Sequence, residues 1–285
     1  MYRLNRTKAR LGEGKATYGM IHGLACPPVA EMIGLAGYDF VVIDGEHGYG
    51  GVRDHLACLQ AVAATSATAI LRVAANDAVA LKRALDLGVE GVLIPDVRKA
   101  REARAAVAAC LYPPRGIRGF SAGTARASDY CLNIQQYLAD DGKELLVCLM
   151  IESAEGVRNA RKIAAVEGVD VIQVGPFDLS YDLGIPGQFE HPKFLEAMAE
   201  VEAAANAEGR ILGGVPLPGM SPVTLLERGY RFITVGADVP LFSDALARKL
   251  PVPAPPLGPT ATSRVVRKRA SRKQNARKNR VRKRN

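Results

Sequence analysis

The chain has 285 residues, of which 48% are hydrophobic, and this is long enough to bury a large core as one domain in the size range of an α/β barrel. The amino terminus is basic but lacks an apolar segment, and no run of about 18 apolar residues occurs, so the sequence indicates neither a secretory signal nor a membrane span. Five widely spaced cysteines without a C-x-x-C pair predict reduced thiols, and we expect a cytoplasmic protein.

The net charge of +9 is concentrated at the carboxyl end of the chain. Residues 264–285 hold 12 Lys and Arg and no acidic residue, so the remaining residues carry 26 basic and 29 acidic side chains, a net charge of −3. We expect a folded domain over residues 1–250, a Pro-rich linker over 251–263 and a basic tail over 264–285 that cannot bury enough apolar surface to fold alone. The tail is either a solvated extension without a role or a non-specific contact for polyanions.

Short apolar runs alternate along the chain with helical patterns. Eight runs have strand character: 17–24, 40–43, 68–73, 91–94, 145–151, 171–174, 210–215 and 232–235. Helical patterns cover 52–64, 78–87, 100–109, 154–166, 192–208, 222–228 and 239–250. Because alternating strands and helices imply parallel pairing, eight such units predict an α/β fold, a closed (β/α)8 TIM barrel. Asp77 is a candidate helix N-cap, and Gly88 and Gly168 lie where helices should end.

The second run leads directly into Asp44, Gly45, Glu46 and His47. A carboxylate beside a histidine can hold its tautomer and tune its proton affinity, as a general base near neutral pH requires. The alternative is that these residues only cap the strand or bond to the next loop. In a barrel of this type the reacting groups gather at the carboxyl ends of strands, so the position favours a catalytic role.

Three further strand ends carry polar residues. Arg72 closes the third run, Glu152 follows the fifth and Asp178 follows the sixth. Glu152 and Asp178 could converge on one hard divalent cation, with structural hydrogen bonding as the alternative for each. The planar fork of Arg72 suits a carboxylate or a developing enolate oxygen, and the alternative is a structural ion pair with Asp44 or Glu46.

Residue types and motifs that the sequence lacks also restrict the possible chemistry. A Schiff-base aldolase needs a lysine inside the barrel, yet none of the eight apolar runs contains one. A metal ion, rather than an imine, is then the expected electron sink. No G-x-G-x-x-G or G-x-x-x-x-G-K-[ST] pattern occurs, so a nucleotide cofactor has no support.

The chain resembles the HpcH/HpaI aldolases, metal-dependent pyruvate aldolases of the aldolase and citrate lyase superfamily. The resemblance spans roughly residues 19–250 and includes Arg72. Its motifs are AGYDF at 36–40, DGEH at 44–47, RALDLG at 83–88, GVLIP at 91–95, YPPRGIRG at 112–119, IES at 151–153, VEGVD at 166–170 and GPFDLS at 175–180.

The resemblance implies that Glu152 and Asp178 bind Mg, Mn or Co, which pyruvate chelates through its carboxylate and keto oxygens. His47, poised by Asp44, would act as the base through a metal-bound water, and Arg72 would stabilise the enolate and the aldehyde oxygen. The reaction would be cleavage of a 4-hydroxy-2-oxo acid to pyruvate and an aldehyde, or the reverse condensation, through a metal-bound pyruvate enolate.

Further residues are implicated by the same resemblance. Family members are usually homohexamers, in which Asp86 would reach into a neighbour's site. Substrate contacts, or support for the residues that make them, are expected from Glu46, Asp86, Gly175, Pro176, Phe177 and Arg118.

Two departures and two alternatives remain. Some family members have a glutamine where this chain has Met150, two residues before Glu152, which removes one polar contact near the substrate. The segment from Pro113 to Gly142 is long for a connection of this kind and is a candidate substrate-selecting loop. The alternatives are a citrate lyase-like or acyl-CoA lyase relative, although such lyases generally lack the Glu46-His47 pair, and a non-catalytic barrel whose tail binds polyanions.

Overall fold

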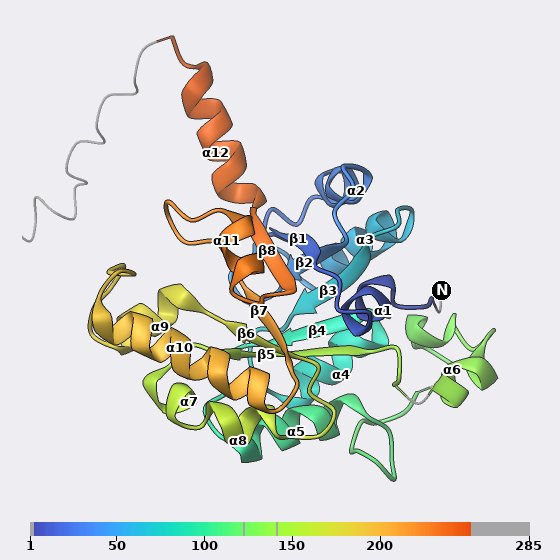
Figure 1. Cartoon of the computed structure of the whole chain (residues 1–285). Helices are drawn as coiled ribbons and strands as arrows, with labels where there is room; N and C mark the ends of the chain where they lie inside the picture. The colour runs from blue at the N-terminus through green and yellow to red at the C-terminus, as the bar shows by residue number, and fades with distance from the viewer. Residues whose placement is uncertain (1–2, 122, 141, 252–285) are drawn as a thin grey trace, which may run out of the picture. The chain divides into compact units, whose positions relative to one another are not determined.

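The computed structural model describes residues 3–121, 123–140 and 142–251, and its centre is a closed parallel barrel (Figure 1). The strands pair in chain order, and β1 pairs with both β2 and β8. The predicted TIM barrel is therefore confirmed. The strands are β1 Thr17–His22, β2 Phe40–Asp44, β3 Thr68–Arg72, β4 Gly91–Ile94, β5 Leu146–Ile151, β6 Val171–Val174, β7 Ile211–Gly214 and β8 Phe232–Ala237.

Helices alternate with these strands along the chain and occur in all seven ranges that the sequence predicts as helical. They are α1 Arg6–Gly12, α2 Pro27–Leu35, α3 Val52–Ala63, α4 Ala78–Asp86, α5 Ala100–Cys110, α6 Ile134–Asp140, α7 Ala154–Arg158, α8 Ala160–Ala164, α9 Pro176–Asp182, α10 Pro192–Ala207, α11 Pro222–Glu227 and α12 Asp238–Lys249. A 3₁₀ turn, η1 Arg126–Ser128, and α6 lie in the segment that the sequence suggested as one long loop.

Helix boundaries follow from local chemistry. The Asp77 side chain accepts the N–H groups of Val79 and Ala80 and so caps α4, as predicted. Gly88 and Gly168 have φ values of 79° and 88°, in the left-handed region where a helix ends at low cost. The predicted helix 154–166 is instead two helices, because Asn159 leaves helical geometry and its side chain bonds to backbone carbonyls.

Side chains of each strand alternate between the lumen of the barrel and the layer beneath the helices. Phe40 and Val42 face the lumen, and Phe40 stacks on Phe232 with ring centroids 4.1 Å apart. This stack requires Gly19, since a Cβ there would lie 2.1 Å from the Phe40 ring. By the same alternation, the next inward-facing residue of β2 is Asp44. Its side chain lies at the opening of the lumen at the carboxyl ends of the strands, and we call this opening the rim.

Met1–Leu241 forms one compact unit that contains the barrel. A second unit begins at Phe242 and includes the rest of α12. The predicted linker and basic tail fall outside the described residues from position 252 onward, and the division at residue 250 stays a prediction. Within the described ranges, no helix combines the length and the apolar character that crossing a bilayer demands.

Candidate active site

The rim brings together polar side chains from the ends of β2, β3 and β5 and from the first turn of α9, which follows β6. Asp44 and Arg72 are the last residues of β2 and β3 and stand opposite each other in the register. Glu152 directly follows β5, and Asp178 lies in the first turn of α9, three residues after Gly175. Because parallel strands carry their carboxyl ends to one side of the barrel, residues far apart in sequence form a single site.

Arg72 is held by two carboxylates. Its Nε and Nη2 atoms donate to the two oxygens of Asp44 at 2.9 and 2.7 Å, a bidentate pair, and its Nη1 lies 3.1 Å from a Glu46 oxygen. Burial by itself would raise the pKa of Asp44. The hydrogen bonds and the positive charge of Arg72 outweigh this effect of burial, and the pKa of Asp44 therefore lies below its usual value. The ion pairs that the sequence left as an alternative role for Arg72 are thus present, and they fix its fork at the rim.

The predicted pairing of Asp44 with the His47 imidazole is wrong. Among the described contacts, Asp44 reaches His47 through its backbone N–H, at 3.1 Å, because both carboxylate oxygens already face Arg72. The imidazole Nε2 lies 3.7 Å from Glu46 instead, and the His47 side chain is 65% exposed. Glu46 therefore bridges Arg72 and His47, and the imidazole is free to meet a ligand from solvent.

Glu152 is a buried carboxylate among other carboxylates. One oxygen accepts the backbone N–H of Asp96 at 2.7 Å. Burial, and then the negative charges of Glu46, Asp178 and Asp96, raise its pKa to about 7. The rim thus holds more negative charge than Arg72 neutralises.

This donor set fits a divalent cation. Carboxylate oxygens are hard ligands, and a cation between Glu152 and Asp178 would offset the repulsion that raises the pKa of Glu152. Within the described residues, no group of three or more His, Cys, Asp and Glu side chains is arranged as a metal cluster. Any ion here would therefore complete its coordination with substrate or water, as catalytic sites of magnesium type do.

Gly175 makes room for Glu152. A Cβ on Gly175 would lie 2.3 Å from a Glu152 oxygen, so the carboxylate occupies the space that the glycine leaves. Pro176 then starts α9 at its first turn, where proline is well tolerated, and this places Asp178 within that turn. Phe177 is 56% exposed and packs edge-on against Phe189. Gly175 and Pro176 thus shape the site by backbone geometry.

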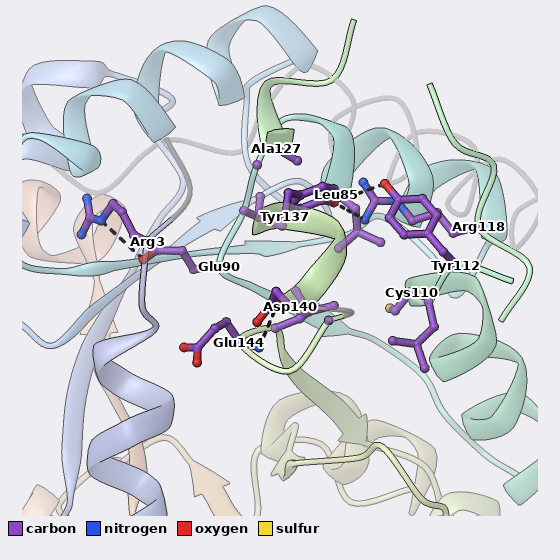
Figure 2. A pocket seen from close by; sticks show the side chains of 15 residues that line it. Arg3, Leu85, Glu90, Cys110, Tyr112, Arg118, Ala127, Tyr137, Asp140 and Glu144 are labelled. Carbon is purple, nitrogen blue, oxygen red and sulfur yellow. Dashed lines mark hydrogen bonds and ion pairs between the residues drawn. The ribbon is translucent and has the colours of Figure 1, made fainter. Parts of the chain in front are cut away.

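Asp86 and Arg118 do not join the rim of their own chain. The Arg118 guanidinium is buried, donates to Asp86 at 2.8 Å and to the Tyr137 hydroxyl at 2.9 Å, and lies over the Tyr112 ring. Arg118, both tyrosines and Glu90 line a cavity of about 80 Å³, and Figure 2 shows these side chains. Glu90 precedes β4, so this cavity lies at the amino ends of the strands, and within this chain Arg118 contacts Asp86 and the two tyrosines rather than the rim. The expected role of Arg118 toward the substrate stays a prediction.

Sequence reasoning missed two groups near the rim. Asp96, which has a positive φ of 49°, donates its N–H to Glu152 and could have been found as another polar residue after a strand. His22 ends β1 and bonds through Nδ1 to Asp238 at 2.7 Å, joining β1 to the start of α12. Asp238 also accepts the backbone N–H of Gly23. No spacing signal connects residues 22 and 238, since only barrel closure brings them together.

The fold and the rim define a TIM-barrel enzyme with carboxylates, an arginine and a histidine at the carboxyl ends of its strands. The family model described as HpcH/HpaI aldolase/citrate lyase matches residues 18–245, and the chain belongs to this family. It is 38% identical over 255 residues to a 4-hydroxy-2-oxo-heptane-1,7-dioate aldolase from Salmonella paratyphi C (strain RKS4594), covering 87% of this chain and 95% of that protein.

Two other relatives agree with this assignment. A 5-keto-4-deoxy-D-glucarate aldolase from Citrobacter koseri (strain ATCC BAA-895 / CDC 4225-83 / SGSC4696) is 37% identical over 241 residues, covering 85% of this chain and 93% of that protein. The crystal structure of an HpcH/HpaI aldolase/citrate lyase family protein from Burkholderia cenocepacia J2315 superimposes with a TM-score of 0.81 at 34% identity, covering 86% of this chain and 97% of that one. The chain is accordingly an aldolase, a carbon–carbon lyase.

Proposed function

We propose that the protein is a class II aldolase that cleaves a 4-hydroxy-2-oxo acid to pyruvate and an aldehyde, or joins them, with a divalent metal ion as cofactor. The observation that carries this proposal is the buried Glu152 carboxylate, whose pKa is raised to about 7 by burial and by neighbouring carboxylates. Glu152 and Asp178 would hold Mg, Mn or Co. Such an ion supplies a Lewis acid that lowers the cost of forming an enolate from the keto acid.

The residues around the proposed metal position have complementary roles in catalysis. Arg72 presents a fixed positive charge to oxygen atoms that become negative as the carbon–carbon bond breaks. Glu46 lies beside the Nε2 atom of His47, so it would stabilise the imidazolium form after the imidazole accepts a proton. His47 is exposed at the rim and can exchange that proton with solvent. No lysine occurs in any of the eight strands, which agrees with metal rather than imine chemistry.

We infer that the enzyme works as a homo-oligomer, and the family resemblance favours a hexamer. Asp86 lies beside Arg118, away from the rim of its own chain, so a catalytic contribution from it would have to be made in a neighbouring subunit. Light scattering coupled to gel filtration gives the oligomeric state directly. A monomer with full activity would contradict this part of the proposal.

Proton exchange at the pyruvate methyl group tests the central chemistry. The protein is incubated with pyruvate and Mn²⁺ or Mg²⁺ in deuterated water, and methyl proton loss is followed by NMR. We expect exchange with metal, little exchange after EDTA treatment, and loss of exchange in His47→Ala and Glu152→Gln. Metal-independent exchange, or unchanged exchange in both variants, would overturn the proposed mechanism.

A further inference from the structure

Two cysteines lie beside a buried histidine at the end of β1. His22 is 1% exposed, and its Nδ1 atom bonds to Asp238 at 2.7 Å. Its second ring nitrogen, Nε2, lies 3.1 Å from the backbone nitrogen of Cys26 and 3.5 Å from the Sγ atom of Cys58. These four residues belong to the barrel unit, and the proposed aldolase reaction uses none of them. We call this cluster the thiol site.

The hydrogen bonds fix the protonation of the imidazole. A backbone N–H group can only donate, so the Nε2 atom that accepts from Cys26 must carry a lone pair, and the ring proton is on Nδ1. Nδ1 donates that proton to the Asp238 carboxylate. The Cys58 thiol faces the same Nε2 lone pair and can give it a proton. A base that a carboxylate orients, within reach of a thiol, is the arrangement that activates sulfur as a nucleophile.

The two cysteines differ in their access to solvent. Cys58 is 0% exposed, and burial raises the pKa of its thiol to about 11. Cys26 is partly exposed, and it is the residue immediately before α2. An oxidant that arrives from solvent therefore reaches Cys26 first, whereas Cys58 needs a base before it can act as a nucleophile. The imidazole of His22 is placed to be that base.

The contacts around His22 bring the two cysteines together. The Cys26 backbone nitrogen and the Cys58 sulfur lie within 3.5 Å of the same Nε2 atom, so they are separated by no more than twice that distance. A negative charge on Cys26 raises the pKa of Cys58 more than the Asp238 carboxylate does, so the two sulfurs lie close together. Helices α2 and α3 also pack against each other. A disulfide joins residues whose Cα atoms are about 4.4–6.8 Å apart, and the contacts around Nε2 fall in the same range.

We propose that Cys26 and Cys58 form a redox modification site that hydroperoxides oxidise to a disulfide, with His22 as the proton acceptor. The disulfide would tie the loop after β1 to α3. Gly23 of that loop accepts the backbone N–H of Tyr49, two residues after His47, so the link would form beside the segment that carries the catalytic imidazole. Exchange with a small thiol would return the reduced state. This inference does not depend on the proposed aldolase function.

The oxidation has two steps. The Cys26 thiolate attacks one oxygen of hydrogen peroxide, the O–O bond breaks, hydroxide leaves, and Cys26 becomes a sulfenic acid. Cys58 then gives its proton to Nε2 of His22, and its sulfur attacks the Cys26 sulfur. The S–O bond breaks, and the leaving hydroxide takes the proton from the imidazolium to form water. In total, two thiols and one hydrogen peroxide yield one disulfide and two molecules of water.

Peptide mapping of the oxidised, full-length, Mg²⁺-loaded protein tests the site. The reduced protein is treated with hydrogen peroxide, alkylated, digested without reductant and analysed by mass spectrometry. We expect a cross-linked peptide that contains Cys26 and Cys58 and that disappears after reduction. Cys110 is the matched control, because it is buried like Cys58 and none of its described hydrogen bonds involves a histidine, so it should stay reduced. Absence of the cross-link, or equal oxidation of Cys110, overturns the proposal.

Two variants test the order of events, with dimedone as the probe for sulfenic acid. In Cys58→Ser the Cys26 sulfenic acid has no thiol to condense with, so its labelling should exceed that of the wild type by at least about tenfold. His22→Gln should slow disulfide formation by at least about tenfold, since the amide is no base. If His22→Gln does not fold, Asp238→Asn takes its place. Labelling of Cys26 that is equal in Cys58→Ser and wild type, or a wild-type rate without the base, overturns the mechanism.

Discussion

Arg72 is the only arginine that pairs with both Asp44 and Glu46 among the described residues, and the geometry of that pairing cannot be reproduced by lysine. Its planar fork donates two parallel hydrogen bonds to Asp44 while a third nitrogen faces Glu46. A lysine ammonium is a point charge that cannot satisfy both carboxylates in this geometry. Arg72 therefore contributes fixed positions of its hydrogen-bond donors as well as a positive charge.

Arg72→Lys should lower kcat by about 10² to 10³, the range seen when a fixed donor to a developing oxyanion is lost. The variant keeps the positive charge, so its circular dichroism spectrum should match that of the wild type. Arg161→Lys is the matched control, since Arg161 pairs with Glu208 on the surface and is 75% exposed. A kcat for Arg72→Lys equal to that of this control would show that the fork has no catalytic role.

The raised pKa of Glu152 predicts a pH-dependent stability in metal-free protein. Its pKa is about 7 in the folded chain and 4.5 as the ordinary value, so between these pH values the folded state keeps a proton that the unfolded state releases. The contribution to stability is full below pH 4.5 and is lost as the pH rises through 7, a change of about 3 kcal/mol. Added Mg²⁺ or Mn²⁺ should restore stability at high pH.

Urea unfolding of wild type and Glu152→Gln at pH 5 and pH 8, with EDTA, measures this contribution. The neutral amide cannot titrate, so the variant should gain stability relative to the wild type by about 2 to 3 kcal/mol between the two pH values. Protein concentration is held fixed, since assembly shifts apparent stability. If the free energies of unfolding of the two proteins differ by the same amount at both pH values, the buried state of Glu152 among other carboxylates is contradicted.

The positions of the rim residues follow from sequence, but their contacts do not. Asp44, Arg72 and Glu152 each follow an apolar run, and parallel strands must bring such positions to one end. Which oxygen pairs with which donor depends on side-chain geometry, so Arg72, rather than His47, takes the Asp44 carboxylate.

At the scale of whole elements, all eight strands were predictable because each is an apolar run bounded by polar or glycine residues. Helices α1, α2, α6 and α9 were not predicted. Helices α2 and α9 are short, and each begins at a proline, which a pattern search treats as a break. Yet the turn from β6 into α9 positions the site, because Gly175 admits Glu152 and the first helical turn presents Asp178. The connection that positions the site, from β6 into α9, was thus one whose helix the sequence pattern did not predict.

Gly175→Ala tests this connection. The backbone φ of −97° suits alanine, but the new Cβ would lie 2.3 Å from a Glu152 oxygen and would displace the carboxylate. We expect the affinity for Mn²⁺, measured by calorimetry, to fall at least tenfold, as for other changes that reorient metal ligands, while the far-ultraviolet spectrum is retained. Gly236→Ala, near the end of β8, is the control because a Cβ there meets no atom within 4 Å. Equal affinities in both variants would contradict the predicted role of Glu152.

At the scale of the whole molecule, charge separates the barrel from the basic tail. Removing residues 264–285 changes the net charge from +9 to −3, so the excess of positive charge lies in the tail, and we expect attraction to polyanions to come from it. The tail has no aromatic residue on which bases could stack, and binding through phosphate contacts alone releases counterions and weakens steeply with salt. Its attraction to nucleic acid should therefore be non-specific and independent of catalysis.

Three proteins test this separation: the full chain, residues 1–263, and a full-length variant with all 12 tail Lys and Arg replaced by glutamine. The full chain should bind a single-stranded oligonucleotide at low salt, with log K falling linearly against log salt at about −0.7 per phosphate neutralised, and the other two should not bind. Aldolase kcat should be equal in all three, because the rim residues lie within Met1–Leu241. Retained binding by the glutamine variant would place the polyanion contact on the barrel, and a lower kcat in both altered proteins would make the tail part of the enzyme.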